Sequence, residues 1–333
     1  MSIVNVSWLV WPLIIALPLM LTQTIVPSLH YSSVFPAAWY DIKPKDYGAS
    51  DADRPSPLGL TLGLLAVVVG QIFTLLYFSF IALPAGKQRA IAELKKQDAV
   101  KYQDTAFVAI QKEGARPYAL REGIITHLAQ PEGFVLLGGY LIGTWMFGWM
   151  PPSYYSFAGG INWMHVFQQL LYQDSLQYMM HMIEHSIKGT GIIKFPFTSY
   201  CYEFKWPFNL YAVSHKPHHV FTNPRFFDAF NGSVTDTTLM ILIPLFMTAY
   251  LVDANVWSYM TFGSLYANWL CLIHSEYNHP WDPLFRKLGF GTAADHHVHH
   301  KLFTSNFGHL FMYCDWLFGT YRDPKQVDLF NKL

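Results

Sequence analysis

Long apolar runs alternate with short polar connections along this chain. A helix rises about 1.5 Å per residue, so about 20 apolar residues cross the ~30 Å hydrocarbon core of a bilayer. Residues 7–29 carry no charge, and 58–84 contains a Gly59-xxx-Gly63 pair that permits close helix packing. The pattern predicts spanning helices at residues 7–29, 58–84, 133–150, 161–183, 238–256 and 258–273.

The charged residues of the connections predict the orientation. The connection 85–131 holds eight Lys or Arg residues, and basic connections stay in the cytosol. Its first half is expected to be helical at the membrane surface, as a solvated connector. The connection 30–57 has only Lys43, Lys45 and Arg54 with four aspartates, which suits the opposite face. Counting crossings from there places the histidine clusters described below on the cytosolic side.

Composition agrees with lipid as the solvent. Hydrophobic residues make up 52% of the 333 residues and charged residues only 13%, where a soluble chain has roughly 25%. The net charge is zero, which excludes an electrostatic grip on nucleic acid. Cys201, Cys271 and Cys314 are far apart, so neither a disulfide framework nor a thiolate zinc site is expected. The first basic residue, Lys43, follows the first apolar run, which argues against a cleavable signal peptide.

Histidine is concentrated in one part of the chain, since 11 of 15 histidines lie from His181 to His300. Residues three or four apart share a helix face, and neutral imidazole binds iron, zinc or copper. A lone histidine is more often a hydrogen-bonded core residue, but ten in this spacing indicate metal binding. Ten ligands exceed what one ion accepts, so the count predicts two ions. The clusters read His181-Met-Ile-Glu-His185, His215-Lys-Pro-His218-His219, His274-Ser-Glu-Tyr-Asn-His279 and Asp295-His296-His297-Val-His299-His300.

The fourth predicted span carries a polar face that leads to the first cluster. Polar side chains at membrane depth normally face the interior of a helix bundle. This face is expected to continue from the metal site toward a substrate chamber, although interhelical hydrogen bonding alone also explains its glutamines. Its members are Gln169, Gln173, Asp174, Gln177, His181, Glu184 and His185.

These motifs, followed by Asn306-Phe-Gly308 and Asp315-Trp-Leu-Phe-Gly319-Thr320-Tyr321, resemble the fatty acid hydroxylase and sterol desaturase superfamily of membrane non-haem di-iron enzymes. The resemblance covers residues 160–323. It implies an all-α integral membrane protein, a multi-span helical bundle with a cytosolic histidine-rich cap that holds two metals. Residues 1–130 would form N-terminal spans and the basic loop, and 131–333 the catalytic domain.

The resemblance also implies which residues bind iron. His297 is extra to the pattern and is expected behind the ligands, and the spacing of His279 from His274 is one residue longer than in some relatives. Carboxylates often orient metal-bound imidazoles; Asp174, Glu184, Asp236 and Asp295 are the candidates for that role. The implied iron ligands are His181, His185, His215, His218, His219, His274, His279, His296, His299 and His300.

In this superfamily, two iron ions reduce O2 with two external electrons and attack an unactivated lipid. Hydroxylation, desaturation and epoxidation share the first step, so the ligands do not reveal the outcome. The chain has no GxGxxG after a strand and no haem-domain HPGG. The resemblance therefore implies cytochrome b5 and its NAD(P)H reductase as electron donors.

The last motif, Asp315 to Tyr321, resembles the sterol branch of the superfamily more than the fatty acyl hydroxylases. This resemblance favours squalene or a sterol as substrate. Met182 stands where the usual sterol pattern has arginine, which weakens the match to a C-5 desaturase or C-4 methyl oxidase. The superfamily also includes an alternative squalene epoxidase, and extra N-terminal spans fit such a member. A fatty acyl or sphingolipid hydroxylase is the alternative within the superfamily.

Two further classes use membrane histidines. A metal transporter would spread them through the depth of the bilayer, whereas these gather at one face. A haem-binding bundle would use two to four and leave the others unexplained. By analogy the enzyme is expected in the endoplasmic reticulum membrane with its site facing the cytosol, and no KDEL or dilysine signal stands at the C-terminus.

Overall fold

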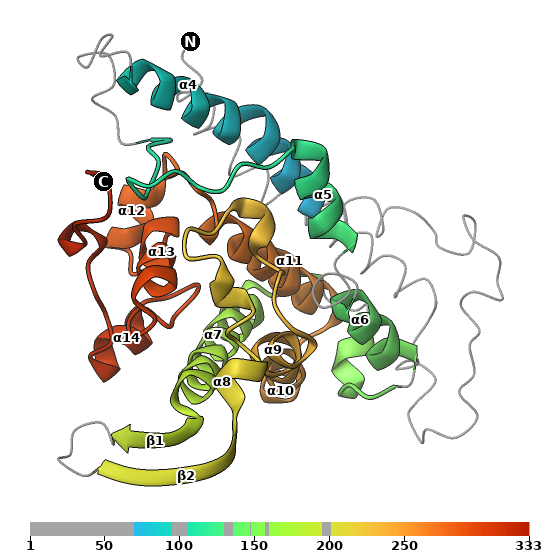
Figure 1. Ribbon diagram of the computed structural model, residues 1–333. Coiled ribbons are helices and arrows are strands. Elements are labelled where there is room, and N and C mark those ends of the chain that lie inside the picture. The colour runs from blue at the N-terminus through green and yellow to red at the C-terminus, as the bar shows by residue number, and fades with distance from the viewer. Residues whose placement is uncertain are drawn as a thin grey trace, which may run out of the picture.

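The computed structural model describes residues 70–94, 106–129, 136–146, 148–156, 160–194 and 201–332 (Figure 1). The predicted first span, the connection 30–57 and the beginning of the second span lie outside these residues. The described part of the predicted second span, residues 70–84, is helical, and the helix continues into the predicted connection as far as residue 94. A π-helical turn lies within it at Phe78–Ala82.

The described part is mostly helical, as predicted. The main helices are α4 (Leu83–Leu94), α5 (Leu120–Ala129), α6 (Leu136–Met146), α7 (Trp163–Ser186), α10 (Ile243–Leu251), α11 (Val256–Ile273), α12 (Asp282–Lys287), α13 (Ala293–Leu302) and α14 (Tyr313–Phe318). Two single-turn helices, α8 (Leu210–Val213) and α9 (Val234–Thr237), accompany them, and a π-helical turn at Thr238–Leu242 joins α9 to α10.

Local capping explains where the long helices begin. The Asn162 side chain accepts hydrogen bonds from the N–H groups of Met164 and His165 at the start of α7. Asn255 does the same for Ser258 at the start of α11. Both starts lie within two residues of the predicted ones. Among the described residues, one helical stretch, Val234–Leu251, is long and apolar enough to cross a membrane.

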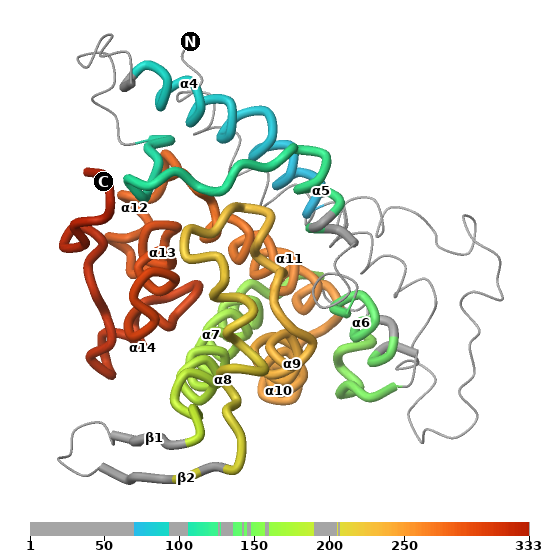
Figure 2. The backbone as a smooth tube through the Cα atoms, viewed as in Figure 1, coloured from blue at the N-terminus to red at the C-terminus, as the bar shows by residue number. Residues whose placement is uncertain are grey.

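α11 is the centre of the bundle. It is buried along almost its whole length, because it packs against α7 on one side and α13 on another, while α10 also packs against α7. Figure 2 shows α7, α10 and α11 together, with α12, α13 and α14 gathered beside them toward the C-terminus. A helix that is apolar nearly all round is typical of such a central position.

The all-α prediction was wrong for the segment after α7. β1 (Lys188–Lys194) and β2 (Cys201–Asn209) form an antiparallel hairpin that projects from the bundle in Figure 1. Ile193 pairs with Tyr202, and Gly191 with Phe204. The β-branched and aromatic residues of these strands favour extended backbone over helix.

The connection before α5 attaches to the C-terminal part of the chain. The Phe107 N–H donates to Asn278 O at 2.6 Å and the Ile110 N–H to Glu276 O at 3.0 Å. Gln111 pairs with Phe330 in an isolated antiparallel bridge. The polar connection therefore forms one wall of the histidine-rich cap.

Candidate metal centre

Four elements bring nine histidines into two buried groups. The five-histidine group consists of His181, His185, His215, His219 and His299. The four-histidine group consists of His218, His274, His296 and His300. Within each group the nitrogen atoms that can bind a metal lie within 4.8 Å of one another.

In the five-histidine group, α7 supplies two rings and α13 one, and the segment after α8 supplies the rest. The Nε2 atoms of His181 and His215 lie 2.8 Å apart. The Nε2 of His219 lies 3.1 Å from that of His185 and 3.0 Å from that of His299. The imidazoles therefore converge through their outer nitrogens on one small volume.

The four-histidine group has the same construction at the end of α11. The Nε2 of His274 lies 3.3 Å from that of His218 and 3.0 Å from that of His296. The Nε2 of His300 lies 3.1 Å from that of His296, one turn earlier on α13. Because α13 gives His299 to one group and its neighbour His300 to the other, this helix joins the two groups.

The hydrogen bonds made by the Nδ1 atoms determine whether each facing Nε2 carries a proton or a lone pair. The Nδ1 of His181 lies 2.8 Å from Phe307 O, and the Nδ1 of His215 lies 2.7 Å from Asp236 Oδ1. Both oxygens only accept, so each Nδ1 carries the proton and each Nε2 presents a lone pair. Two lone pairs 2.8 Å apart repel, and only a cation between them removes the conflict.

The second group repeats this arrangement. The Nδ1 of His218 donates to Asn231 O at 2.9 Å, and that of His274 donates to Leu270 O at 2.6 Å. Their Nε2 atoms again face each other as lone pairs, at 3.3 Å. The donor set thus fits a metal ion in each group.

Protonation is a poor alternative to metal in these groups. Burial lowers the pKa of His296, His299 and His300 well below the usual 6.5, and neighbouring histidines lower each further. Neutral imidazole, the form that binds metal, is therefore favoured at neutral pH.

The Asn306-Phe-Gly308 and Asp315–Tyr321 motifs after α13 support the five-histidine group. Asp315 accepts hydrogen bonds from the N–H groups of Phe307 at 2.9 Å and Gly308 at 2.8 Å, and from the Thr320 hydroxyl at 2.6 Å. A Cβ on Gly308 would lie 2.9 Å from this carboxylate, so only glycine allows the close approach. This clamp fixes the Phe307 carbonyl, which in turn orients His181.

Two of the four carboxylates predicted to orient imidazoles lie beside one, the His215 ring. Asp236 bonds to His215 Nδ1 directly, and Glu184 Oε2 lies 3.8 Å from the same nitrogen while Glu184 Oε1 accepts from Ser214. Asp174 and Asp295 make no hydrogen bond or ion pair with an imidazole of the described residues.

Asp174 and Asp295 instead satisfy backbone donors. Asp174 accepts from three successive N–H groups, at residues 309–311, with the shortest bond of 2.7 Å from Leu310. Asp295 closes the capping box of α13 with Thr292 and pairs with Arg286 at 3.2 Å. Buried N–H groups need acceptors, and these carboxylates are the ones within reach.

His279 and His297 lie outside both groups. His279 contacts the Tyr77 hydroxyl through Nδ1 at 2.9 Å and Leu272 O through Nε2 at 3.2 Å. His297 points away from the neighbouring ligand positions, with Ser275 O 3.0 Å from its Nε2. The extra residue in the third cluster turns its second imidazole away from the centre.

His309 is the site residue that the sequence patterns missed. Its ring centroid lies 5.1 Å from that of His181 and 5.1 Å from that of His296. It follows the Asn306-Phe-Gly308 motif directly, and this position was the only signal that could have found it.

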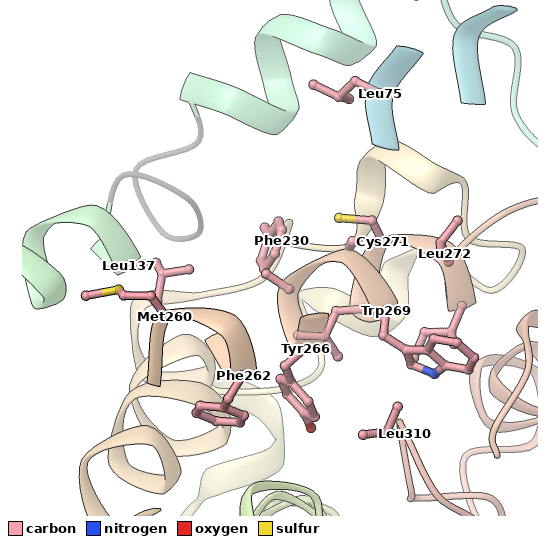
Figure 3. Close-up of a cluster of buried hydrophobic side chains, with 14 of the residues drawn as sticks. Leu75, Leu137, Phe230, Met260, Phe262, Tyr266, Trp269, Cys271, Leu272 and Leu310 are labelled. Atoms are coloured by element: carbon pink, nitrogen blue, oxygen red, sulfur yellow. The ribbon is translucent and has the colours of Figure 1, made fainter. Parts of the chain in front are cut away.

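An apolar cavity lies inside the bundle, on the far side of Tyr266 from α7's polar face. Figure 3 shows Leu137 and Met260 side by side, with Phe230 and Tyr266 nearby. The Tyr266 hydroxyl donates to Gln177, one turn before His181. The lining residues are Leu137, Leu141, Phe230, Ile241, Leu245, Tyr259, Met260, Gly263, Tyr266, Ala267 and Leu270.

Comparison with known proteins gives this site its context. Residues 166–320 match the fatty acid hydroxylase family. The chain is 50% identical over 323 residues to an alternative squalene epoxidase of Phaeodactylum tricornutum (strain CCAP 1055/1), covering 96% of this chain and 81% of that protein. The chain belongs to the fatty acid hydroxylase family.

More distant relatives match less than half of the chain. A Delta(7)-sterol-C5(6)-desaturase of Nicotiana tabacum is 28% identical over 153 residues, which is 45% of this chain and 47% of the relative. Methylsterol monooxygenase 1-1 of Arabidopsis thaliana is 27% identical over 163 residues, 47% of each protein. No solved structure gives a significant match. As a member of this family, the chain is an oxygenase.

Proposed function

We propose that this chain is a multi-span membrane di-iron enzyme that epoxidises squalene, a linear alkene of the sterol pathway. One atom of O2 enters the carbon–carbon double bond, and two electrons and two protons reduce the other atom to water. The observation that carries the proposal is the near full-length similarity to an alternative squalene epoxidase, joined to two groups of converging imidazole lone pairs.

The extent of the similarity favours epoxidation over the other outcomes. The sterol desaturase and the methylsterol monooxygenase match less than half of the chain. The squalene epoxidase also matches the N-terminal region, to which the sequence motifs gave no family. We propose that residues 1–130 and 131–333 form a membrane region and a catalytic region of one enzyme.

The nine imidazoles are the proposed iron ligands, and bound iron would supply the reduction of O2. The protein's own contribution is orientation. Asp236 holds the His215 ring and stabilises its Nδ1–H tautomer, with Glu184 beside it. Backbone carbonyls do the same for five other ligands, and these partners raise ligand basicity. The five are His181, His218, His274, His299 and His300.

We propose that the isoprenoid chain packs against the walls of the apolar cavity, whose volume of about 30 Å³ must enlarge to admit it. These walls are apolar apart from tyrosine hydroxyls, as a hydrocarbon ligand requires. On α7, Gln169 is fully buried and both of its amide atoms have no partner among the described residues. With Gln177 bonded to Tyr266, this polar face separates the cavity wall from the metal groups.

We further propose cytochrome b5 and its reductase as electron donors, and the endoplasmic reticulum membrane as the location with the metal groups facing the cytosol. The support is the orientation predicted by the basic connection and the position of its residues 106–112 against the metal-bearing cap.

The test is lipid analysis of yeast that express the full chain under labelled O2. We expect squalene to gain one labelled oxygen, and His299→Ala to abolish the gain. The matched control is His165→Ala, at the opposite end of α7, which should retain it. Loss of two hydrogens from a sterol, or a labelled hydroxyl on an acyl chain, would replace squalene epoxidation by another outcome of the same centre. Unchanged lipids with cytochrome b5 and its reductase co-expressed would refute the enzymatic proposal.

A further inference from the structure

The boundary between the two histidine groups is lined by an imidazole that belongs to neither. His309 contacts His181 of the five-histidine group and His296 of the four-histidine group, each at a ring-centroid distance of 5.1 Å. We call the volume between these three rings the seam. Elsewhere the groups meet through α13 and the segment from His215 to His219.

The main chain of His309 is held from three directions. Its N–H donates to Asp174 Oδ1 at 3.3 Å, and its carbonyl accepts from Trp269 Nε1 at 3.3 Å. On the third side, a Cβ added to Gly291 would lie 2.7 Å from the His309 carbonyl oxygen, so the two segments are in close backbone contact. The direction of the His309 side chain is therefore fixed by its surroundings.

One ring nitrogen of His309 lacks a hydrogen-bond partner among the described residues, although the ring interacts with the Phe307 backbone. His309 is 5% exposed, and its Nδ1 is buried with no hydrogen-bond partner among the described residues. Buried polar atoms are nearly always paired in a folded protein. A buried, unpaired ring nitrogen beside two metal-binding groups points to a partner that enters from outside the chain.

His309 belongs to neither group, so its position does not make it a tenth metal ligand. The nitrogens of each group lie within 4.8 Å of one another, and no nitrogen of His309 joins either set. The imidazole instead faces the seam, where it reaches both sets equally.

We propose that His309 binds a small ligand, water or an anion, held in the seam between the two histidine groups, by donating a hydrogen bond to it. The inference rests on the proposed di-iron centre. It assigns His309 as a positioning residue for small molecules that enter the centre, distinct from the nine imidazoles that hold the ions.

The experiment uses the purified full chain loaded with iron, with azide as the probe. Iron content per chain is measured first, and azide is then titrated by its charge-transfer absorption. In His309→Leu we expect two irons per chain, as in the unmodified protein, and an azide affinity lower by about tenfold, the effect of one lost hydrogen bond to a charged ligand. His309→Gln keeps a donor and should recover part of the affinity.

The controls separate the inference from the proposed function. His297→Gln alters another buried imidazole, whose Nε2 faces Ser275 O, and should bind iron and azide normally. An unmodified chain without two irons would refute the di-iron centre and this inference with it. Normal azide affinity in His309→Leu would overturn the inference alone, and loss of one iron in both His309 variants would make His309 an ordinary ligand.

Discussion

The two histidine groups use the same ligand but are supported differently. In the five-histidine group, a carboxylate, Asp236, bonds directly to His215. In the four-histidine group, the Nδ1 atoms that have partners meet neutral carbonyls, those of Asn231, Leu270 and Phe221. A carboxylate makes its imidazole a stronger donor than a carbonyl does. Two ions of one kind would therefore bind to the two groups with unequal affinity.

The largest expected effect comes from removing ligands on α13. His299→Ala should cost the ion of the five-histidine group, and His300→Ala the ion of the four-histidine group, since the neighbours point into different groups. Each variant should retain one iron per chain and lose detectable lipid oxidation. Iron analysis with Mössbauer spectroscopy distinguishes the two remaining sites. Identical spectra in the two variants would contradict the division into groups.

Asp236→Asn tests the carboxylate that distinguishes the groups. We expect about 10–100-fold weaker binding of one ion, because His215 loses its charged partner. The other ion should be unaffected. Competition with a metal chelator measures both affinities, and Asp253→Asn, a carboxylate on the loop after α10, is the matched control. Equal weakening of both ions would show that Asp236 acts on the whole fold.

Asp315→Ala tests the clamp behind the five-histidine group. The N–H groups of Phe307 and Gly308 would lose their acceptor, at a cost of about 2–4 kcal/mol. We expect a lower melting temperature and preferential loss of the ion bound near His181. Asp315→Asn keeps one acceptor oxygen, so its melting temperature should lie between those of Asp315→Ala and the unmodified chain. A melting temperature unchanged in Asp315→Ala would contradict this role.

The smallest effect on iron binding concerns Glu276, two residues after His274. Burial raises the pKa of Glu276 to about 7, while its oxygens accept from the Phe226 N–H and the Tyr118 hydroxyl. The folded state therefore binds a proton that the unfolded state releases near pH 4.5, so stability falls as pH rises from about 4.5 to 7.

Glu276→Gln mimics the protonated form and should remove that fall, which we expect to be about 3 kcal/mol. Melting temperatures at pH 5 and pH 8 provide the measurement. Iron content should not change, since this carboxylate supports backbone rather than an imidazole. A variant as pH-sensitive as the unmodified chain would assign the effect to another group.

The sequence predicted the bundle helices well because their signals are local. The apolar runs that predicted them depend on residues close in the chain, and so do the caps at Asn162 and Asn255 that the structure adds. The β1–β2 hairpin was not predicted from the sequence, because its strands stabilise each other by pairing and helical periodicity does not reveal such pairing.

The nine clustered histidines were predicted by spacing together with the family resemblance, and their role as ligands remains a prediction. Partners distant in sequence were not predictable. Asp174 accepts hydrogen bonds from residues 309–311, more than 130 positions away, and the position of His309 depends on this and other tertiary contacts. His279 has a suitable residue type, but its ring faces Tyr77 and Leu272.

The Asp315 clamp also has a consequence for biosynthesis. Chains are made from the N-terminus, and His181 appears long before the Phe307 carbonyl and the Asp315–Thr320 pair that hold its ring. The His181 ring therefore gains its support only once the chain has been made past Thr320. A product truncated before residue 315 would carry all 15 histidines without the clamp that orients His181.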